Sequence, residues 1–232
     1  GYFGSGAMLG HRDVEYIKNY ADTDGITIYD AMKEYGLVPE KIEEAAWKKG
    51  SIGYFMEAHI EQGPVLDTEN VEIGLVDCIV GIQRYMITIH GRADHAGTTP
   101  MDMRKDAVDA AAKVISRIAD WAREKADGTV ATVGYMKTIP GGMNIVAEEV
   151  QFTVDIRSSN NDNINDITRR IRHALDCEVK EMDGSYEMDS KLSITPVQLS
   201  EEMLTIMEEA CEKEGKSFYY PSPILCTDNA AM

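Results

Sequence analysis

The chain has 232 residues, and 23 Lys and Arg against 40 Asp and Glu give it a formal net charge of −17 at pH 7. This charge opposes binding to a nucleic-acid backbone or an anionic membrane, so we expect neither as a partner, and any anionic ligand needs locally placed cations. Hydrophobic residues (44%) and charged residues (27%) are at ordinary globular levels, and no apolar run approaches the ~18 residues of a membrane helix. The four cysteines are scattered, with no CxxC pair and no secretory leader, which predicts reduced thiols in a cytoplasmic protein.

The first fifty residues predict short helices and loops. Residues 1–10 are rich in glycine but lack the Lys-Ser/Thr of a phosphate-binding loop, so we expect a simple loop there. The apolar spacing over 24–35 predicts a short helix after a Thr or Asp cap. A second short helix is expected over 40–49, where acidic residues precede basic ones.

The segment that follows contains the first candidate site. Residues 51–60 are expected to form a strand that brings His59 to its end, and Gln62-Gly63-Pro64 then forces a turn. An imidazole at such a position suits an enzyme site, although a semi-buried structural histidine is the better explanation of this segment taken alone. The apolar, β-branched residues 71–80 predict a buried strand.

Residues 84–188 predict a compact unit with the order βαββαβ. Its clearest element is a helix whose apolar stripe is formed by Ala107, Ala110, Ala111, Val114, Ile115, Ile118 and Trp121. A polar, glycine-containing loop over 91–100 precedes it. The remaining predicted elements are strands over 84–90, 128–136, 147–156 and 177–188 and a helix over 161–175.

This order predicts a four-stranded antiparallel sheet with both helices on one face. The fold class is therefore α/β, part of a larger catalytic domain with an inserted α+β domain. We place the boundaries at 1–82, 83–192 and 193–232, with a further helix over 201–213 and an extended segment over 219–224 in the last part.

Several motifs in a fixed order carry a family resemblance. They are Phe3-Gly-Ser-Gly-Ala-Met, Ala58-His-Ile-Glu-Gln-Gly-Pro-Val-Leu, His95-Ala-Gly-Thr-Thr-Pro-Met-Asp-Met-Arg-Lys-Asp-Ala, Gly142-Met-Asn-Ile-Val and Asp155-Ile-Arg. Over about residues 1–215 the chain resembles the amidohydrolase branch of the dinuclear-metal M20 peptidase family. That branch includes N-carbamoyl-L-amino-acid hydrolases, allantoate amidohydrolases and β-ureidopropionases, and in the family the βαββαβ unit is a lid that forms the dimer interface.

The resemblance implies a role for five residues. His59 matches a metal ligand for Zn²⁺ or Mn²⁺, with Co²⁺ and Ni²⁺ as alternatives, and the family normally binds two ions per site. Gln62 matches a substrate-contacting amide. His95 matches the lid histidine that reaches into the partner's site and helps to hold the substrate and the developing oxyanion. Asn144 and Arg157 match the pair that clamps the substrate carboxylate.

Each of these residues also has a plain structural explanation when taken singly. Arg157 can be the solvated end of a strand, Asn144 can supply a turn conformation after two glycines, and His95 can be an ordinary loop histidine. The joint occurrence of the motifs in family order favours the functional interpretation.

Two features depart from the family pattern. The resemblance implies a preceding segment with the first metal-binding His, the bridging Asp and a Glu-Glu pair that contains the general base, and none of these can be assigned here. The family's last metal ligand lies in a Gly-His-Asp-Ala stretch, whereas residues 220–232 contain no histidine. This ending is similar to a short signature of the tRNA threonylcarbamoyladenosine-synthesis protein, which would imply an ATP-dependent protein acting on tRNA.

The sequence therefore predicts a metal-dependent hydrolase of linear amide C–N bonds in N-carbamoyl amino acids, allantoate or related ureido acids. The expected assembly is a homodimer formed through the lid. The alternative is a catalytically inactive, lid-bearing fragment that only dimerises.

Overall fold

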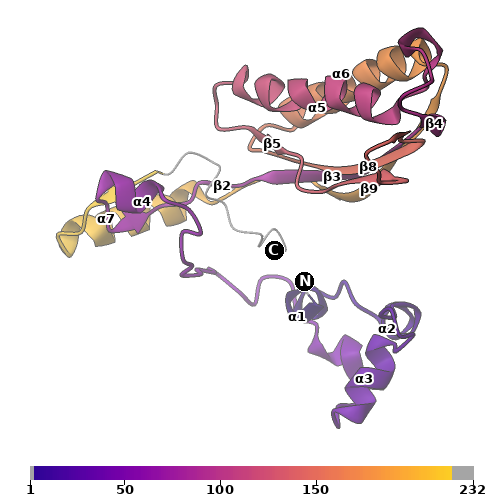
Figure 1. Cartoon of the computed structure of the whole chain (residues 1–232). Coiled ribbons are helices and arrows are strands. Elements are labelled where there is room, and N and C mark those ends of the chain that lie inside the picture. Colours follow the sequence, from indigo (N-terminus) through magenta and orange to yellow (C-terminus); the bar gives the residue numbers. More distant parts are fainter. Residues whose placement is uncertain (1–2, 221–232) are drawn as a thin grey trace. The chain divides into compact units, whose positions relative to one another are not determined.

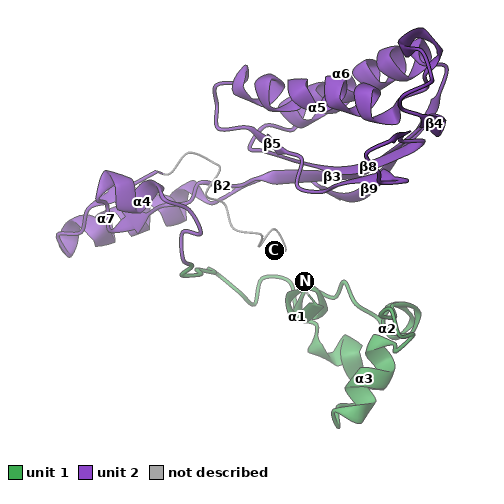
Figure 2. Cartoon of the chain, viewed as in Figure 1, with its two compact units in different colours: residues 1–59, 229–232 green, residues 60–228 purple. Residues whose placement is uncertain are grey.

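The computed structural model describes residues 3–220, which divide into two compact units between His59 and Ile60 (Figure 2). Each unit has its own hydrophobic core. Within the described range, no helix combines the length and the apolar character needed to cross a membrane.

The first unit is a small helical assembly around Ala7, Ile17 and Ile42. Its elements are α1 (Phe3–Met8), α2 (Val14–Asn19), α3 (Ile28–Glu34) and the 3-10 helix η1 (Pro39–Ala45). The expected loop over 1–10 is wrong, because most of it forms α1. The predicted helix over 24–35 is confirmed as α3, and Thr27 caps it by accepting from the Asp30 N–H at 3.0 Å. The helix expected over 40–49 is shorter and tighter than predicted.

The strand expected over 51–60 is absent. These ten residues are exposed and have no regular secondary structure. A strand needs a neighbour for its backbone N–H and C=O groups, and none of the strand pairings in the described residues involves this segment. His59 therefore lies in an exposed segment without regular secondary structure.

The second unit contains segments that precede the inserted domain in the sequence and segments that follow it, and strands of the two groups pair with each other. These are α4 (Val65–Glu69), β1 (Ile73–Gly74), β2 (Cys78–Ile79), β10 (Val197–Gln198), α7 (Glu201–Lys213) and β11 (Phe218–Tyr219). β1 pairs in parallel with β11, and β2 pairs antiparallel with β10. The continuous strand expected over 71–80 is split because its two halves have different partners. The helix expected over 201–213 is confirmed as α7, and the pairings support an insertion.

Residues 81–194 form the inserted domain. Its main elements are β3 (Gly81–His90), α5 (Ala107–Arg123), β5 (Val130–Thr132), β6 (Met136–Ile139), β8 (Glu149–Ser158), α6 (Asn161–Glu181) and β9 (Ser185–Ile194). The domain follows the predicted βαββαβ order except that two strands, β5 and β6, replace one predicted strand. The sheet therefore has five strands, not the four expected. The sheet is antiparallel, with β8 and β3 in the centre and β9 at one edge. Both helices cover the same face (Figure 1).

Strict alternation along β8 builds the core of this domain. Val150, Phe152, Val154 and Ile156 are fully buried under the two helices. The predicted stripe of α5 is confirmed, because five of its seven members are buried and the other two, Ile115 and Trp121, pack against the same core. The alternate residues of β8, every second one from Glu149 to Arg157, face the side of the sheet without helices.

Two element boundaries in this domain differ from the prediction. The strand expected over 128–136 is interrupted into β5 and β6, which pair with successive parts of β8 around Gly134. The strand expected from 177 is wrong at its start, because α6 continues to Glu181 and buries Val179. Asp183 then adopts a positive φ of 52°, and Gly184 donates to the Val179 carbonyl at 3.0 Å, which ends the helix.

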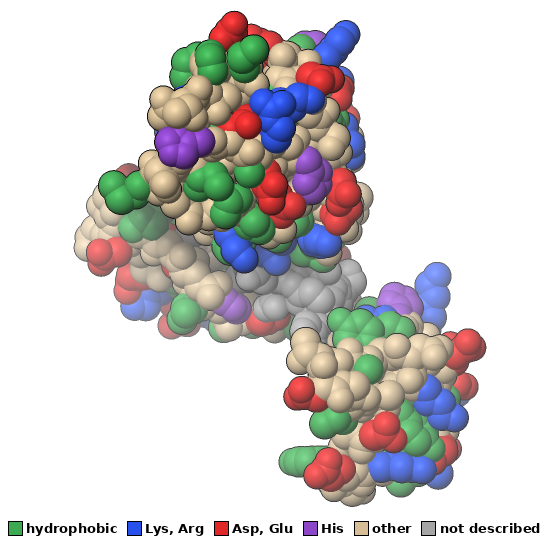
Figure 3. Space-filling model, turned by 45° about the vertical axis from the view of Figure 1, so that its right-hand side comes forward, with side chains coloured by type: hydrophobic (Ala, Val, Ile, Leu, Met, Phe, Trp, Pro, Cys, Tyr) green, Lys and Arg blue, Asp and Glu red, His purple; other side chains and the backbone are tan. Residues whose placement is uncertain are grey.

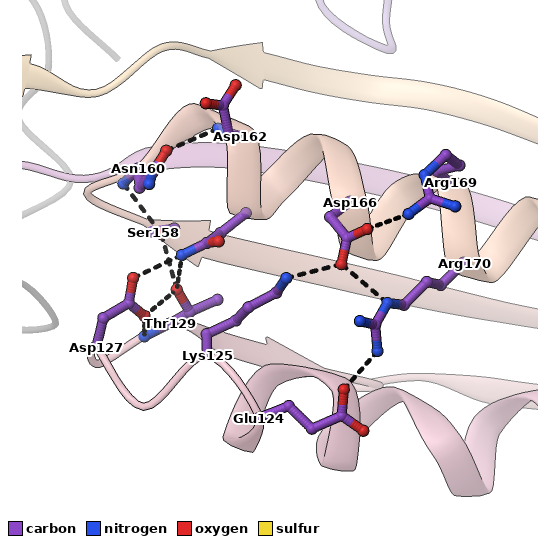
Figure 4. A network of polar contacts seen from close by, with 11 residues as sticks. Glu124, Lys125, Asp127, Thr129, Ser158, Asn160, Asp162, Asp166, Arg169 and Arg170 are labelled. Atoms are coloured by element: carbon purple, nitrogen blue, oxygen red, sulfur yellow. Dashed lines mark hydrogen bonds and ion pairs between the residues drawn. The ribbon is translucent and has the colours of Figure 1, made fainter.

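A polar network fastens the α5–β5 turn to the start of α6 (Figure 4). Thr129 and Ser158 share a buried hydrogen bond of 2.8 Å, and Asp127 accepts from Asn163 at 2.5 Å. Lys125 lies 2.7 Å from Asp166, and both side chains are largely shielded from solvent. This network fixes the end of β8 that follows Arg157.

Candidate functional site

His95 and Asn144 are neighbours at one end of the inserted domain. His95 lies in β4 (Asp94–His95), which pairs antiparallel with β7 (Ile145–Val146) and places His95 opposite Ile145. The Ala96 N–H donates to the Asn144 carbonyl at 3.0 Å. Both residues are exposed. The segments that carry His95 and Asn144, from separate motifs, therefore meet at the end of the sheet where β3 stops, near β4 in Figure 1.

The loop that carries His95 is closed by its own backbone. Gly91 donates to the Glu148 carbonyl at 2.6 Å, and Arg92 donates through its amide to the Lys105 carbonyl at 2.9 Å. A Cβ on Gly91 would lie 2.1 Å from that carbonyl oxygen, so only glycine fits at this position. These two hydrogen bonds hold the start of the loop, at Gly91 and Arg92, against Glu148 and against Lys105 at the end of the loop.

Two arginines hold the interior of this loop. Arg92 donates to both carboxylate oxygens of Asp94 at 2.9–3.2 Å and to the Met103 carbonyl at 2.8 Å. Arg104 donates from Nε to the Thr99 carbonyl at 3.0 Å and from Nη2 to the Ala96 carbonyl at 2.7 Å. The family resemblance assigns no role to either arginine, although Arg104 lies within the His95 motif and Arg92 lies just before it.

Arg157 lies on the open face of the sheet beside two other charged residues. Its Nε donates to Asp155 at 2.9 Å, and the Nε of Arg84 donates to the other oxygen of Asp155 at 2.7 Å. Burial raises the pKa of Asp155, but the hydrogen bonds from Arg157 and Arg84 outweigh it and hold that pKa below its usual value. Asp155 thus stays ionised between two guanidinium groups, and its contact orients Arg157 along the sheet.

The structure does not bring Arg157 to Asn144 within one chain. Arg157 lies eight residues along β8 from Glu149, beside the first residues of β3. At about 3.3 Å per residue this is a distance of roughly 26 Å. Asn144 lies beyond Glu149, since β4 follows the end of β3 and β7 precedes the start of β8. A small substrate cannot contact both residues of the same chain.

His59 and Gln62 lie outside the inserted domain, on either side of the division between the two units. Gln62 is exposed and has a positive φ of 56°, a conformation that costs a non-glycine residue free energy. Glu61 accepts from the N–H groups of Val65 and Leu66 at 2.6 and 3.1 Å and so caps α4. The carboxylate beside His59 in sequence is therefore engaged in a structural contact.

The described residues do not assemble a metal site. Across residues 3–220, no group of three His, Cys, Asp or Glu side chains converges closely enough to hold an ion. His59 alone is an insufficient donor set for a structural or catalytic ion. The described part of this chain therefore does not fit the predicted metal centre without further ligands.

Comparison with known proteins defines the class to which this fold belongs. Residues 79–183, which include most of the inserted domain, match the family model described as a peptidase dimerisation domain of the M20 type. A solved structure titled as an amidase of the hydantoinase/carbamoylase family from Burkholderia multivorans superposes with a TM-score of 0.77 at 28% identity. The match covers 94% of this chain and 52% of that one.

Curated relatives narrow the class to one branch. The chain is 37% identical over 212 residues to an N-carbamoyl-L-amino-acid amidohydrolase of Paenarthrobacter aurescens, covering 89% of this chain and 52% of the relative. It is 32% identical over 217 residues to the allantoate amidohydrolase of Escherichia coli, covering 94% and 52%. Residues 79–183 are an M20 dimerisation domain, and the predicted resemblance of the chain to this amidohydrolase branch is confirmed. The chain spans about half the length of the curated relatives that it matches.

Proposed function

We propose that the complete protein hydrolyses a linear amide C–N bond of a small ureido acid, such as an N-carbamoyl amino acid or allantoate. Relatives at 32–37% identity carry the names of enzymes that act on these two compounds. The chain also supplies the polar groups that such a substrate needs. They are a guanidinium for the carboxylate, and an imidazole and amides for the ureido group.

The proposed roles follow the chemistry of each side chain. Arg157 binds the substrate carboxylate, because a planar guanidinium offers paired donors to a carboxylate and overcomes the repulsion of an acidic protein. Asn144 and Gln62 contribute amide hydrogen bonds. His95 donates to the oxygen that gains negative charge when the carbonyl is attacked.

The observation that carries the proposal is the separation of these groups along the sheet. His95 and Asn144 lie at one end of the inserted domain and Arg157 at the other, roughly 26 Å apart or more. A single chain cannot close them around one small substrate. We propose that two copies of the chain, paired through this domain, each complete the site of the other.

We further propose that the complete enzyme binds divalent metal ions, Zn²⁺ or Mn²⁺ with Co²⁺ or Ni²⁺ as alternatives, and that His59 is one ligand. Such an ion would supply a Lewis acid and a water of lowered pKa. The other ligands and the general base are not among the groups that residues 3–220 bring together.

We propose a cytoplasmic location, which agrees with the finding that the described cysteines Cys78, Cys177 and Cys211 form no disulfide. Acidic and basic side chains are interspersed over the face of the molecule in Figure 3, which is unlike the basic surface of a nucleic-acid-binding protein.

A second candidate is that this chain by itself is an inactive module that dimerises through the inserted domain. It is favoured by the lack of a three-ligand cluster in the described residues. The tail similar to a tRNA-modifying protein lies within 221–232, outside the described residues, apart from Tyr220.

Ammonia release from N-carbamoyl amino acids and allantoate, with elemental analysis of bound metal, tests the proposal. The complete protein is expected to hydrolyse at least one of these substrates and to contain about two divalent ions per chain. The 232-residue chain is expected to show little metal and no turnover. A metal-replete complete protein that hydrolyses none of these substrates would exclude the proposed function.

A further inference from the structure

The imidazole of His95 is held by a backbone amide two residues away. The Gly97 N–H donates to Nδ1 of His95 at 3.1 Å. An amide N–H can only donate, so Nδ1 accepts and carries no proton. A neutral imidazole in this position must carry its proton on Nε2, which makes Nε2 a hydrogen-bond donor.

Gly97 also approaches the ring too closely to tolerate a side chain without adjustment. A Cβ added to Gly97 would lie 3.2 Å from Cε1 and 3.5 Å from Nδ1 of His95. The backbone of Gly97 has no positive φ that would explain the glycine. The close approach to His95 therefore accounts for glycine at this position.

Arg104 fixes the same loop from the other side. Its guanidinium joins the carbonyls of Ala96 and Thr99, the residues that enclose Gly97 and Thr98. The Thr98 and Thr99 amides in turn donate to the His95 carbonyl at 3.4 and 3.1 Å. Arg104 makes no ion pair with a described carboxylate, and its guanidinium donates instead to the loop carbonyls. A hydrogen bond from a charged donor is stronger than one between neutral groups.

We propose that Gly97 and Arg104 are positioning residues for His95, and that together they present His95 as a neutral donor through Nε2. The Gly97 amide selects the tautomer. The Arg104 guanidinium fixes the loop backbone so that the Gly97 amide stays within hydrogen-bond distance of Nδ1. Within the proposed hydrolase, on which this inference rests, the Nε2–H then points its proton at the substrate oxygen that becomes negative. His95 in this tautomer acts as a hydrogen-bond donor through Nε2.

Nitrogen-15 NMR of the histidine side chains tests the tautomer without any assay of activity. The chain has five histidines, and a His95→Gln variant assigns the His95 signals by their loss. At a pH where His95 is neutral, Nδ1 is expected to show the shift of an unprotonated, accepting nitrogen and Nε2 that of a protonated one. Gly97→Ala is expected to weaken this preference. A proton on Nδ1 of His95 in the unsubstituted protein would overturn the proposal.

Kinetics of the complete protein test the positioning role. Arg104→Met is expected to lower kcat by roughly 10- to 100-fold with little change in KM, because the loss affects alignment and not carboxylate binding. Arg104→Lys, which can keep one of the two bonds, is expected to lie between. Arg123→Met removes an exposed charge from the last turn of α5, where it pairs with Asp120, and is expected to match the unsubstituted enzyme.

The outcomes separate this inference from the proposed function. If the complete protein hydrolyses no ureido acid, the proposed function fails and the NMR result still decides the tautomer. If it is active but both Arg104→Met and Gly97→Ala keep the full kcat, the positioning role is wrong. Thermal unfolding of each variant identifies any that does not fold, and Gly97→Ala, at an exposed position, serves when Arg104→Met is unfolded.

Discussion

The proposal that two chains complete each other's site can be tested by mixing two inactive variants. His95→Ala removes the donor at one end of the inserted domain, and Arg157→Ala removes the carboxylate-binding group at the other end. In a mixed dimer, one site would combine an intact His95 from one chain with an intact Arg157 from the other. The second site would lack both.

The structure sets the expected magnitudes. The loss of a donor to a developing oxyanion lowers kcat by about 10²–10³, and the loss of a paired charged hydrogen bond of about 3 kcal/mol raises KM by roughly 10²-fold. Each variant alone is therefore nearly inactive at low substrate concentration. Random exchange of equal amounts makes half of the dimers mixed, each with one intact site of two, so about a quarter of the original activity should return.

The assay follows ammonia release after subunit exchange, at a substrate concentration below the KM of the Arg157→Ala variant. As a control, each single variant is mixed with a chain carrying both substitutions, which provides no complementary residue and should restore nothing. A mixture of the two single variants that is no more active than the sum of its components would refute the trans arrangement. His95 of one chain and Arg157 of the other would then not belong to the same site.

Three further predictions concern single substitutions. Gly91→Ala should lower the free energy of unfolding by about 3 kcal/mol, because its Cβ would lie 2.1 Å from the Lys105 carbonyl oxygen. In the same denaturant titration, Gly141→Ala should lower it far less, because the nearest atom to its Cβ, Oγ1 of Thr138, is 3.7 Å away. The Asp155 pKa is lower in the folded protein than its ordinary 3.8, so its ionised form adds stability above that pH and this contribution is lost as the pH falls through the folded pKa. The stability difference between the unsubstituted protein and Asp155→Asn should accordingly be constant above about pH 5 and shrink in acid; a difference that grows in acid would contradict the assignment. Arg157→Ala should raise KM for carboxylate substrates and leave KM for an amide-capped analogue unchanged.

Much of the inserted domain could be predicted from the sequence, because alternation and helical spacing there coincide with burial. Phe152 and its apolar neighbours on β8 recur at every second residue, and all of them lie under the helices. The stripe along α5 repeats at helical spacing and is capped by Asp106, which accepts from the Val108 and Asp109 amides. Local pattern and tertiary environment agree in this domain, so pattern alone was sufficient.

The errors arose where a segment depends on a distant partner. Residues 51–60 have the composition of a strand, but the described residues give them no strand to pair with. Residues 71–80 are apolar throughout, and the split between β1 and β2 is set by β11 and β10, more than a hundred residues away. The extension of α6 depended on Val179 reaching the core, which a short window of sequence does not reveal.

The sequence names candidate site residues, but it does not give their geometry. The motifs named His95 and Asn144 but did not show that their segments meet, which the pairing of β4 with β7 establishes. They gave no indication that Arg157 lies at the far end, since spacing in sequence does not show the direction of β8. The contacts of Arg84 with Asp155 and of Arg104 with the loop carbonyls also needed the fold, because each joins positions on different segments or turns.

The same alternation that builds the core also determines what the open face can do. Burial of Val154 and Ile156 obliges Asp155 and Arg157 to face away from the helices, and the register with β3 places Arg84 directly opposite Asp155. Without that carboxylate, two guanidinium groups would lie together on an exposed face and repel each other. With it, the three charges sum to a single positive charge, which matches a single substrate carboxylate. A shift of β8 by one residue against β3 would bury Arg157 and expose the core, so the stability of the domain and the position of the proposed carboxylate-binding group depend on the same register.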